Sequence, residues 1–191
     1  MKLYEKVPSH VIVNGRKVRL NLEYRNVLRM LDIMEDDSLM PDAREWLAMR
    51  CICRRPRKGM MPEVMRLLFP KQKKKHEKIT DYDQDADLIR AAFLQEYGIN
   101  LYRVKLNWFE FCCLLSNIPE GSKYADILSI RARPMPDATP YNANERQWLA
   151  NAKHEFGLQM TEEEQQAKLS RDIRKLGDFL LAMAGEGEQN G

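Results

Sequence analysis

The chain has 191 residues, of which 44% are hydrophobic and 31% are charged, so it can form one ordinary core beneath a heavily charged exterior. Its net charge of +3 is too small to indicate a nucleic-acid-binding protein by itself, because the distribution of charge matters more than the sum. No run of about 18 uncharged apolar residues occurs, and the first ten residues lack the apolar centre of a signal peptide. We therefore expect neither a membrane span nor secretion.

Residues 8–22 are predicted to form a β-hairpin. Two short apolar runs, HVIV at 10–13 and VRLNL at 18–22, flank Asn14 and Gly15. Asn-Gly between two such runs is the strongest short hairpin signal, because both central residues must accept a positive φ. A two-stranded ribbon is marginally stable alone, so we expect its apolar face to rest on the helices that follow.

Apolar residues at helical spacing predict three helices between the hairpin and residue 70. The first covers 24–34, and the second begins near Pro41, a residue that a first helical turn tolerates. The second helix carries Trp46 and Leu47 among its apolar residues. The third is short, covers 62–69 and is ended by the proline that follows.

A basic region of about residues 54–78 holds ten Lys or Arg residues against two Glu, and we expect it to be exposed. It could bind phosphates or an acidic protein surface, or it could be a solvated loop that keeps the chain soluble, as most charge runs are. Aromatic residues are not interleaved with these lysines, so a base-stacking surface is not indicated and nucleic acid is not the expected partner. The candidate partner-binding residues of this region are Arg54, Arg55, Arg57, Lys58, Lys71, Lys73, Lys74 and Lys75.

The stretch 81–97, DYDQDADLIRAAFLQEY, is predicted to be the central helix. Thr80 is the expected N-cap, the acidic residues of the first turn suit the positive end of the macrodipole, and Gly98 supplies the left-handed residue that ends many helices. Apolar side chains recur at steps of three and four residues, which places them on one helical face. They are Tyr82, Ala86, Ile89, Phe93 and Tyr97.

A capping box between Asn107 and Glu110 is predicted to open the next helix, with Asn in place of the usual Ser or Thr. This helix, 108–116, is apolar on nearly every side and is therefore expected to be buried. A further helix is expected around 124–131. The predicted fold class is mainly α, a helical domain with a small N-terminal β-hairpin, whose core is built from the helices at 81–97 and 108–116.

Residues 1–133 are expected to form the hairpin and helical core, followed by a proline-rich linker at 134–144, a C-terminal helical segment at 145–184 and a disordered tail at 185–191. Within the C-terminal segment, Thr161 and Glu164 form a capping box that opens an amphipathic helix. Its apolar stripe either folds back onto its own domain or meets a partner helix or a second copy. The candidate contact residues are Leu169, Ile173, Leu176, Phe179 and Leu180.

The spacing Asp81-x-Asp83-x-Asp85 is similar to the first half of a calcium-binding loop. Position six is Ala86 where that loop requires Gly, and position twelve is Ala92 where it requires a bidentate Glu. The same residues lie in a helical pattern, so we interpret the carboxylates as the first turn of a helix and expect no metal site.

Four cysteines occur as Cys51-x-Cys53 and Cys112-Cys113, and neither spacing is a disulfide or zinc framework. We expect reduced, core or half-buried thiols in an intracellular protein. A Cys–His nucleophile stays open as an alternative, because such partners meet in space rather than in sequence. No Gly-rich phosphate loop, Gly-x-Ser-x-Gly or His-Glu-x-x-His pattern occurs, so we expect neither an enzyme nor a bound cofactor.

Three stretches, DYDQDADLIRAAFLQEYGINL at 81–101, NWFEF at 107–111 and NIPEG at 117–121, resemble a bacteriophage family known by a gene-product number, gp fifteen. With the hairpin and the lysine-rich segment, the resemblance extends over about residues 7–131. Members of that family are small tail-region proteins, typically encoded just upstream of the long tape-measure protein. The motif residues that we expect to be structural are Asp81, Asp85, Ala86, Ile89, Ala92, Phe93, Tyr97, Gly98, Trp108 and Phe111.

The resemblance implies a non-enzymatic tail-assembly protein, a chaperone that binds the tape-measure protein or tail-tube subunits in the cytoplasm of the bacterial host. Two alternatives stay open. One is a structural component of the virion, such as a tail-completion or connector protein. The other is a nucleic-acid-binding regulator that acts through the basic region at 54–78. The sequence also leaves open whether the chain forms a homo-oligomer.

Overall fold

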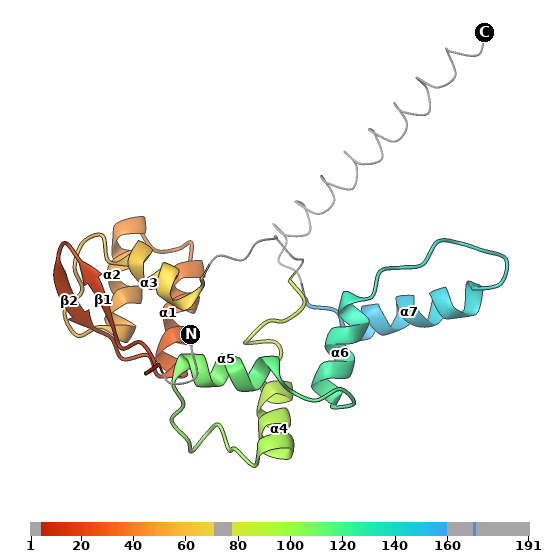
Figure 1. Cartoon of the computed structure of the whole chain (residues 1–191). Coiled ribbons are helices and arrows are strands. Elements are labelled where there is room, and N and C mark those ends of the chain that lie inside the picture. The colour runs from red at the N-terminus through yellow and green to blue at the C-terminus, as the bar shows by residue number, and fades with distance from the viewer. Residues whose placement is uncertain (1–4, 71–77, 160–169, 171–191) are drawn as a thin grey trace, which may run out of the picture. The chain divides into compact units, whose positions relative to one another are not determined.

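The computed structural model describes residues 5–70, 78–159 and Ser170, drawn in colour in Figure 1. The chain divides into two units, Met1–Phe156 and Gly157–Gly191, and all of the described helices and strands belong to the first. In the described residues this unit contains two strands and seven helices, in the order β1 (His10–Val13), β2 (Arg16–Arg19), α1 (Tyr24–Glu35), α2 (Pro41–Ile52), α3 (Met61–Leu68), α4 (Ala86–Tyr97), α5 (Trp108–Ser116), α6 (Lys123–Ala132) and α7 (Ala143–Phe156). The predicted fold class, mainly α with a small N-terminal hairpin, is confirmed.

The hairpin has the predicted Asn-Gly turn. β1 and β2 pair antiparallel with Val11 opposite Val18, and the turn residues Asn14 and Gly15 have φ of 50° and 72°. Val11, Val13 and Val18 are buried, and α3 packs against β1. The apolar face of the ribbon therefore rests on helices, which supplies the burial that two strands alone lack.

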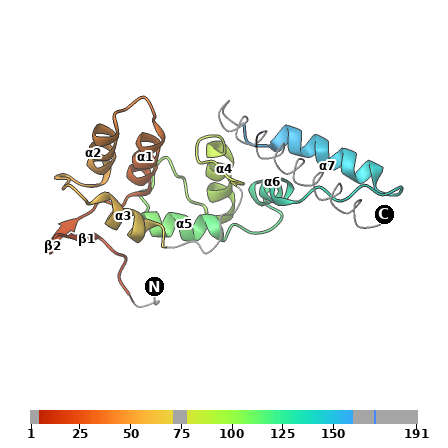
Figure 2. The ribbon, with the colours of Figure 1, turned by 90° about the horizontal axis from the view of Figure 1, so that it is seen from above.

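α1 and α2 lie side by side and make the most extensive helix pair of the unit (Figure 2). α1 buries Val27 and Met30, while α2 buries Ala48, Met49 and Ile52. The two large apolar residues of α2 that the sequence includes in its pattern, Trp46 and Leu47, are 55% and 37% exposed. They lie on the opposite side of the helix, because steps of 100° per residue separate them from the face that contacts α1.

The predicted central core is confirmed as a stack of aromatic rings from α4 and α5. Phe93 of α4 stacks on Phe111 of α5 with ring centroids 5.3 Å apart, and Phe111 stacks on Tyr24 at 4.7 Å. Trp108 is 1% exposed and also stacks on Phe111. Such pairs add specific geometry to the area that they bury.

Two expectations about this core are wrong in detail. α5 is not buried on every side, since Cys113 is exposed and only Trp108 and Phe111 are fully buried. One face of so short a helix suffices to close the aromatic stack. The central helix begins at Ala86 rather than near residue 81, and Tyr82 to Asp85 form turns. Gly98 ends α4 in the left-handed conformation with φ of 65°, as predicted.

α7 packs on α6, so the division of the chain falls after Phe156 rather than at the proline-rich segment 134–144 where the sequence places a linker. Within the basic region at 54–78, the predicted short helix at 62–69 is confirmed as α3, which buries Val64 and Leu68. In the described part of the chain, no helix is long and apolar enough to span a membrane.

Candidate functional site

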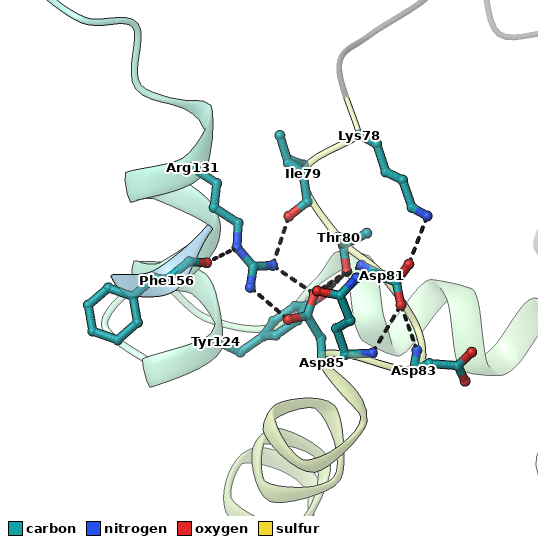
Figure 3. A network of polar contacts seen from close by, with 10 residues as sticks. Lys78, Ile79, Thr80, Asp81, Asp83, Asp85, Tyr124, Arg131 and Phe156 are labelled. Atoms are coloured by element: carbon teal, nitrogen blue, oxygen red, sulfur yellow. Dashed lines mark hydrogen bonds and ion pairs between the residues drawn. The ribbon is translucent and has the colours of Figure 1, made fainter. Parts of the chain in front are cut away.

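The turn that precedes α4 contains a buried ion pair between residues 46 positions apart. Asp85 is 1% exposed, and both of its carboxylate oxygens accept hydrogen bonds from the guanidinium of Arg131 on α6 (Figure 3). The two distances, Nη1 to Oδ2 and Nη2 to Oδ1, are both 2.8 Å. This is the bidentate geometry in which Arg and a carboxylate bind most strongly.

The remaining polar atoms around Asp85 are also satisfied. Its Oδ2 accepts the backbone N–H of Asp81 at 3.0 Å and the hydroxyl of Thr80 at 3.2 Å. The Thr80 hydroxyl also lies 3.1 Å from the hydroxyl of Tyr124 on α6. Burial alone would raise the pKa of Asp85, but the hydrogen bonds from Arg131 and from the Asp81 backbone lower it below its ordinary value.

Arg131 also joins the ends of two helices. Its Nε donates to the carbonyl of Phe156 at the end of α7, and Nη1 donates to the carbonyl of Ile79 at 3.1 Å. In return, Nζ of Lys153 on α7 donates to the carbonyl of Arg131 at 2.8 Å. Each helix therefore provides a cation for the unpaired carbonyls at the other's C-terminus.

Two of the three aspartates with calcium-like spacing, Asp81 and Asp85, accept hydrogen bonds from protein donors. Oδ1 of Asp81 accepts the backbone N–H groups of Asp83 and Gln84, both at 3.0 Å, and its Oδ2 pairs with Lys78 at 2.7 Å. Asp85 faces Arg131, so Asp81 and Asp85 direct their oxygens to different donors. Among the described residues, no group of three or more His, Cys, Asp or Glu could hold a metal ion.

A second feature is an open pocket of about 250 Å³ between α1 and α4. Its buried lining is apolar and includes Tyr24, Ile89, Leu101 and Phe111. Tyr82 adds a ring from the turn before α4, and burial raises the pKa of its hydroxyl to about 12. At pH 7 the pocket therefore presents neutral aromatic and aliphatic groups on its inner side.

The outer lining of the pocket is charged. Arg25 is held in place, because its guanidinium donates to Glu23 at 2.7 Å and to the carbonyl of Leu101 at 2.5 Å. Arg90 lies over the ring of Tyr102 at 4.8 Å. Arg29 is exposed and makes no hydrogen bond or contact-distance ion pair with any other described residue. The pocket thus combines an apolar interior with one arginine available to a partner.

The pocket also contains an acid, Asp32, on the same helix as Arg29. Partial burial raises the pKa of this carboxyl, the nearby carboxylates of Asp83 and Glu35 raise it further, and the nearby charge of Arg29 offsets part of this shift. Asp32 therefore favours a partner that brings a cation or a hydrogen-bond donor to its side of the opening, whereas the arginine side favours a carboxylate.

Of the contact residues predicted from the basic run, the four that the structure describes do not line this pocket. Arg54, Arg55, Arg57 and Lys58 are exposed between α2 and α3. The other predicted contact residues lie outside the described part of the chain: Lys71, Lys73, Lys74, Lys75, Leu169, Ile173, Leu176, Phe179 and Leu180.

The sequence pattern places Asp85 in a helical first turn but does not identify Arg131 as its partner. Arg131 ends an apolar stripe that contains Tyr124 and Ile127, and a single cation in such a stripe is a signal for a buried acid elsewhere. The signal does not identify which acid. Asp81, Asp83 and Asp85 are all available, and only the tertiary arrangement selects the last.

The family model described as Bacteriophage Gp15 protein matches residues 57–158, more than half of the chain. This match begins after the hairpin and continues through α7, whereas the resemblance recognised in the sequence includes the hairpin and ends near residue 131. Asp85, Arg131 and Phe156 all lie inside it. No curated protein and no solved structure matches the chain.

Proposed function

The chain belongs to the bacteriophage Gp15 protein family, and on this premise we propose that it is a non-enzymatic tail-assembly chaperone. It binds the tape-measure protein or tail-tube subunits in the cytoplasm of the host cell while the tail forms. The observation that carries the proposal is the pocket between α1 and α4, because most of its lining comes from the segment that matches the family.

The physical task of such a chaperone is to cover apolar surface for a limited time. A long helical tape measure exposes apolar stripes until tube subunits enclose them, and exposed stripes of this kind aggregate. A small helical protein with an apolar pocket can bind one stripe residue reversibly. Release needs no chemistry, because the tube subunits compete for the same surface.

The size of the pocket favours a side chain over a small-molecule ligand. Pockets for drug-sized ligands occupy about 300–1,000 Å³, and this one occupies about 250 Å³. A single leucine or phenylalanine from a partner helix would contact Tyr24, Ile89 and Phe111. Apolar anchors that enter such pockets contribute most of the binding energy of many interfaces.

The charges at the opening favour a partner with a carboxylate next to its apolar anchor. Arg29 has no hydrogen-bond or contact-distance ion-pair partner among the described residues. A carboxylate one helical turn from the anchor would reach it, since residues three or four apart lie on one helix face. Arg25 is engaged by carbonyl groups and serves to hold the 101–104 segment against α1.

Co-expression with the neighbouring tape-measure gene tests the proposal. The wild-type chain should co-purify with the tape measure, and Ala86→Phe should lose most of this binding because Ala86 lines the pocket. The matched control is Ala91→Phe on the exposed side of the same helix, which should bind like wild type. Equal binding by both variants, or no co-purification of the wild type, would contradict the proposal.

Mass spectrometry of purified particles separates a chaperone from a virion component. A chaperone should be absent from finished tails, and a phage that lacks its gene should fail to assemble them. Stoichiometric amounts of the chain in finished particles would instead favour the role of a tail-completion or connector protein.

A further inference from the structure

The outer face of α2 exposes large apolar side chains that no other described element covers. Met40, which precedes the helix, is 75% exposed, Trp46 is 55% exposed and Leu47 is 37% exposed. A surface helix normally places charged or polar residues on the side away from the core. α2 instead has one apolar face that contacts α1 and a second that faces away from it.

The exposed face has the spacing of a helix-binding surface. Ala43, Trp46, Leu47 and Arg50 are all exposed and stand at positions i, i+3, i+4 and i+7. These positions align along one side of a helix, as the contact residues of paired helices do. A neighbouring helix could therefore lie along α2 and contact three apolar side chains at once.

The two ends of this face carry opposite charges. At the start of the helix stands the exposed Asp42, preceded by Asp36, which accepts hydrogen bonds from Ser38, and by Asp37, which already pairs with Arg44 of the same helix. From the last turn onward the charges are positive, at Arg50, Arg54, Arg55, Arg57 and Lys58. None of these five cations forms an ion pair with a carboxylate among the described residues.

We propose that α2 pairs with α2 of a second copy of this chain, antiparallel, around a two-fold axis that passes near Trp46 and Leu47. In such an isologous contact, residues at equal distances on either side of the axis meet. With the axis between Trp46 and Leu47, Trp46 of each copy packs on Leu47 of the other, and Arg50 of one copy lies opposite Ala43 of the other, one residue from Asp42. The apolar centre is covered and both charged ends find opposite charges.

A second copy fits this face because the face is its own complement. Because one end of the face is acidic and the other basic, its charges are matched by an antiparallel helix with the same order of charges. A second copy of α2 has that order. The guanidinium of Arg50 lies 5.7 Å from the centre of the Trp46 ring and donates a hydrogen bond to the carbonyl of Arg54, without a carboxylate partner among the described residues. Its charge therefore lies where an approaching carboxylate of the other copy would be.

One helix against its copy is a small interface, so we expect a dimer that dissociates at micromolar concentration. Sedimentation velocity over a concentration series measures it. Trp46→Ala should raise the dissociation constant by at least about 30-fold, because a central tryptophan is the typical hot spot of an interface. The matched control is Trp148→Ala on α7, which removes a tryptophan of equal exposure, 54%, and should leave the dimer unchanged.

Charge reversal identifies the occupant. Asp42→Arg and Arg50→Glu each place like charges together at both ends of the symmetric contact, so each variant alone should be monomeric. A one-to-one mixture of the two variants should dimerise again, because Arg at 42 then lies near Glu at 50, and the unchanged Arg50 lies near the unchanged Asp42. Circular dichroism should show the same helix content for each variant as for wild type.

Several outcomes would overturn the inference: a wild-type chain that stays monomeric at high micromolar concentration, a dimer that Trp46→Ala leaves intact, or a mixture of the charge-reversed variants that does not dimerise. Trp46→Ala should still bind the tape measure through the pocket, so failure of the dimer and failure of the proposed function are separable. Loss of tape-measure binding by Trp46→Ala, with a monomeric wild type, would assign this face to a foreign helix.

Discussion

The turn before α4 and the outer face of α2 reverse the usual distribution of polar and apolar groups in opposite ways. At the first, a carboxylate with 1% exposure is buried against Arg131, while at the second, Trp46 is 55% exposed. The buried charge is tolerated because its oxygens accept four hydrogen bonds from Thr80, Asp81 and Arg131. The exposed ring has no comparable cover among the described residues.

These two regions separate what holds the fold together from what the fold offers to other molecules. The Asp85 network lies within the segment 57–158 that matches the family, and α2 at 41–52 lies outside it. Buried polar groups that are fully satisfied are internal to the fold. We propose that the uncovered apolar side chains of α2, at helical spacing, contact a second copy of the chain.

The largest expected effect concerns the buried region. Arg131→Met should lower the free energy of unfolding by about 3–5 kcal/mol, because it leaves the Asp85 carboxylate buried without its counter-ion. Urea denaturation followed by circular dichroism measures this. Arg133→Met, which changes an exposed arginine just after α6, should stay within about 0.5 kcal/mol of wild type. Equal effects of the two variants would show that the pair is not the link between α4 and α6.

The next expected effect compares two tryptophans. Trp108→Ala should cost about 3–5 kcal/mol, because it opens a cavity in the aromatic stack beside Phe111. Trp46→Ala should change the unfolding free energy of the monomer by less than about 0.5 kcal/mol, since its ring is largely in water. The same denaturation experiment measures both, provided that the protein concentration is below the dissociation constant of the dimer. A large loss in the Trp46 variant would mean that α2 packs this face within its own chain.

The pH dependence of stability is expected to be smaller. The folded pKa of Asp85 is lowered from 3.8, so the unfolded chain takes up this proton first as the pH falls. The stabilisation by the pair is therefore present above about pH 4 and is lost as the pH falls through the lowered folded pKa. Urea midpoints measured from about pH 6 down to about pH 2.5 should fall less steeply for Asp85→Asn than for wild type.

Other carboxyls will contribute to that profile. The pKa of Asp81 is also lowered, since hydrogen bonds from Lys78 and two backbone N–H groups outweigh its burial. The Asp85→Asn variant keeps the pH dependence of stability that Asp81 contributes. The pKa of Asp32 is raised by burial, so its contribution has the opposite sign. An unchanged slope in Asp85→Asn would mean that the ion pair persists in the unfolded state or that Asp85 is not charged.

The smallest expected effect concerns the neutral member of the network. Thr80→Val keeps the shape of the side chain but removes the hydroxyl that donates to Asp85, and should cost about 1 kcal/mol. Thr139→Val, which changes an exposed threonine in the loop before α7, serves as the control and should be close to neutral. A cost as large as that of Arg131→Met would indicate that the network, rather than the ion pair, carries the stability.

Elements with local signals were predictable to within a few residues. The Asn14–Gly15 turn fixes the hairpin register. Both halves of the capping box also form: Oδ1 of Asn107 accepts the backbone N–H of Phe109 at 3.0 Å, and Oε2 of Glu110 accepts the backbone N–H of Asn107 at 3.1 Å. The start of α4 was not predictable in the same way. Asp85 directs its carboxylate to Arg131, Thr80 and the Asp81 backbone, so residues 82–85 turn before the helix begins.

In the candidate site, too, some residues were predictable from the local sequence and others were not. Tyr82, Ile89 and Phe111 are apolar residues of the recognised motif, and their side chains line the pocket as well as the core. Arg25 and Arg29 on α1 come from a stretch that carries no motif. They reach the pocket because α1 lies beside α5 and the 101–104 segment, a placement that depends on the aromatic stack.

The amino-acid sequence by itself determined the bacteriophage family, the mainly helical class, the hairpin turn and where most helices begin and end. The helices and the hairpin turn depend on interactions between residues within a few positions of each other. Only the tertiary structure decided that Asp85 forms its ion pair with Arg131, and which of the two apolar faces of α2 is covered. Both depend on groups that are distant along the chain, and no local pattern specifies which of several equivalent candidates will meet.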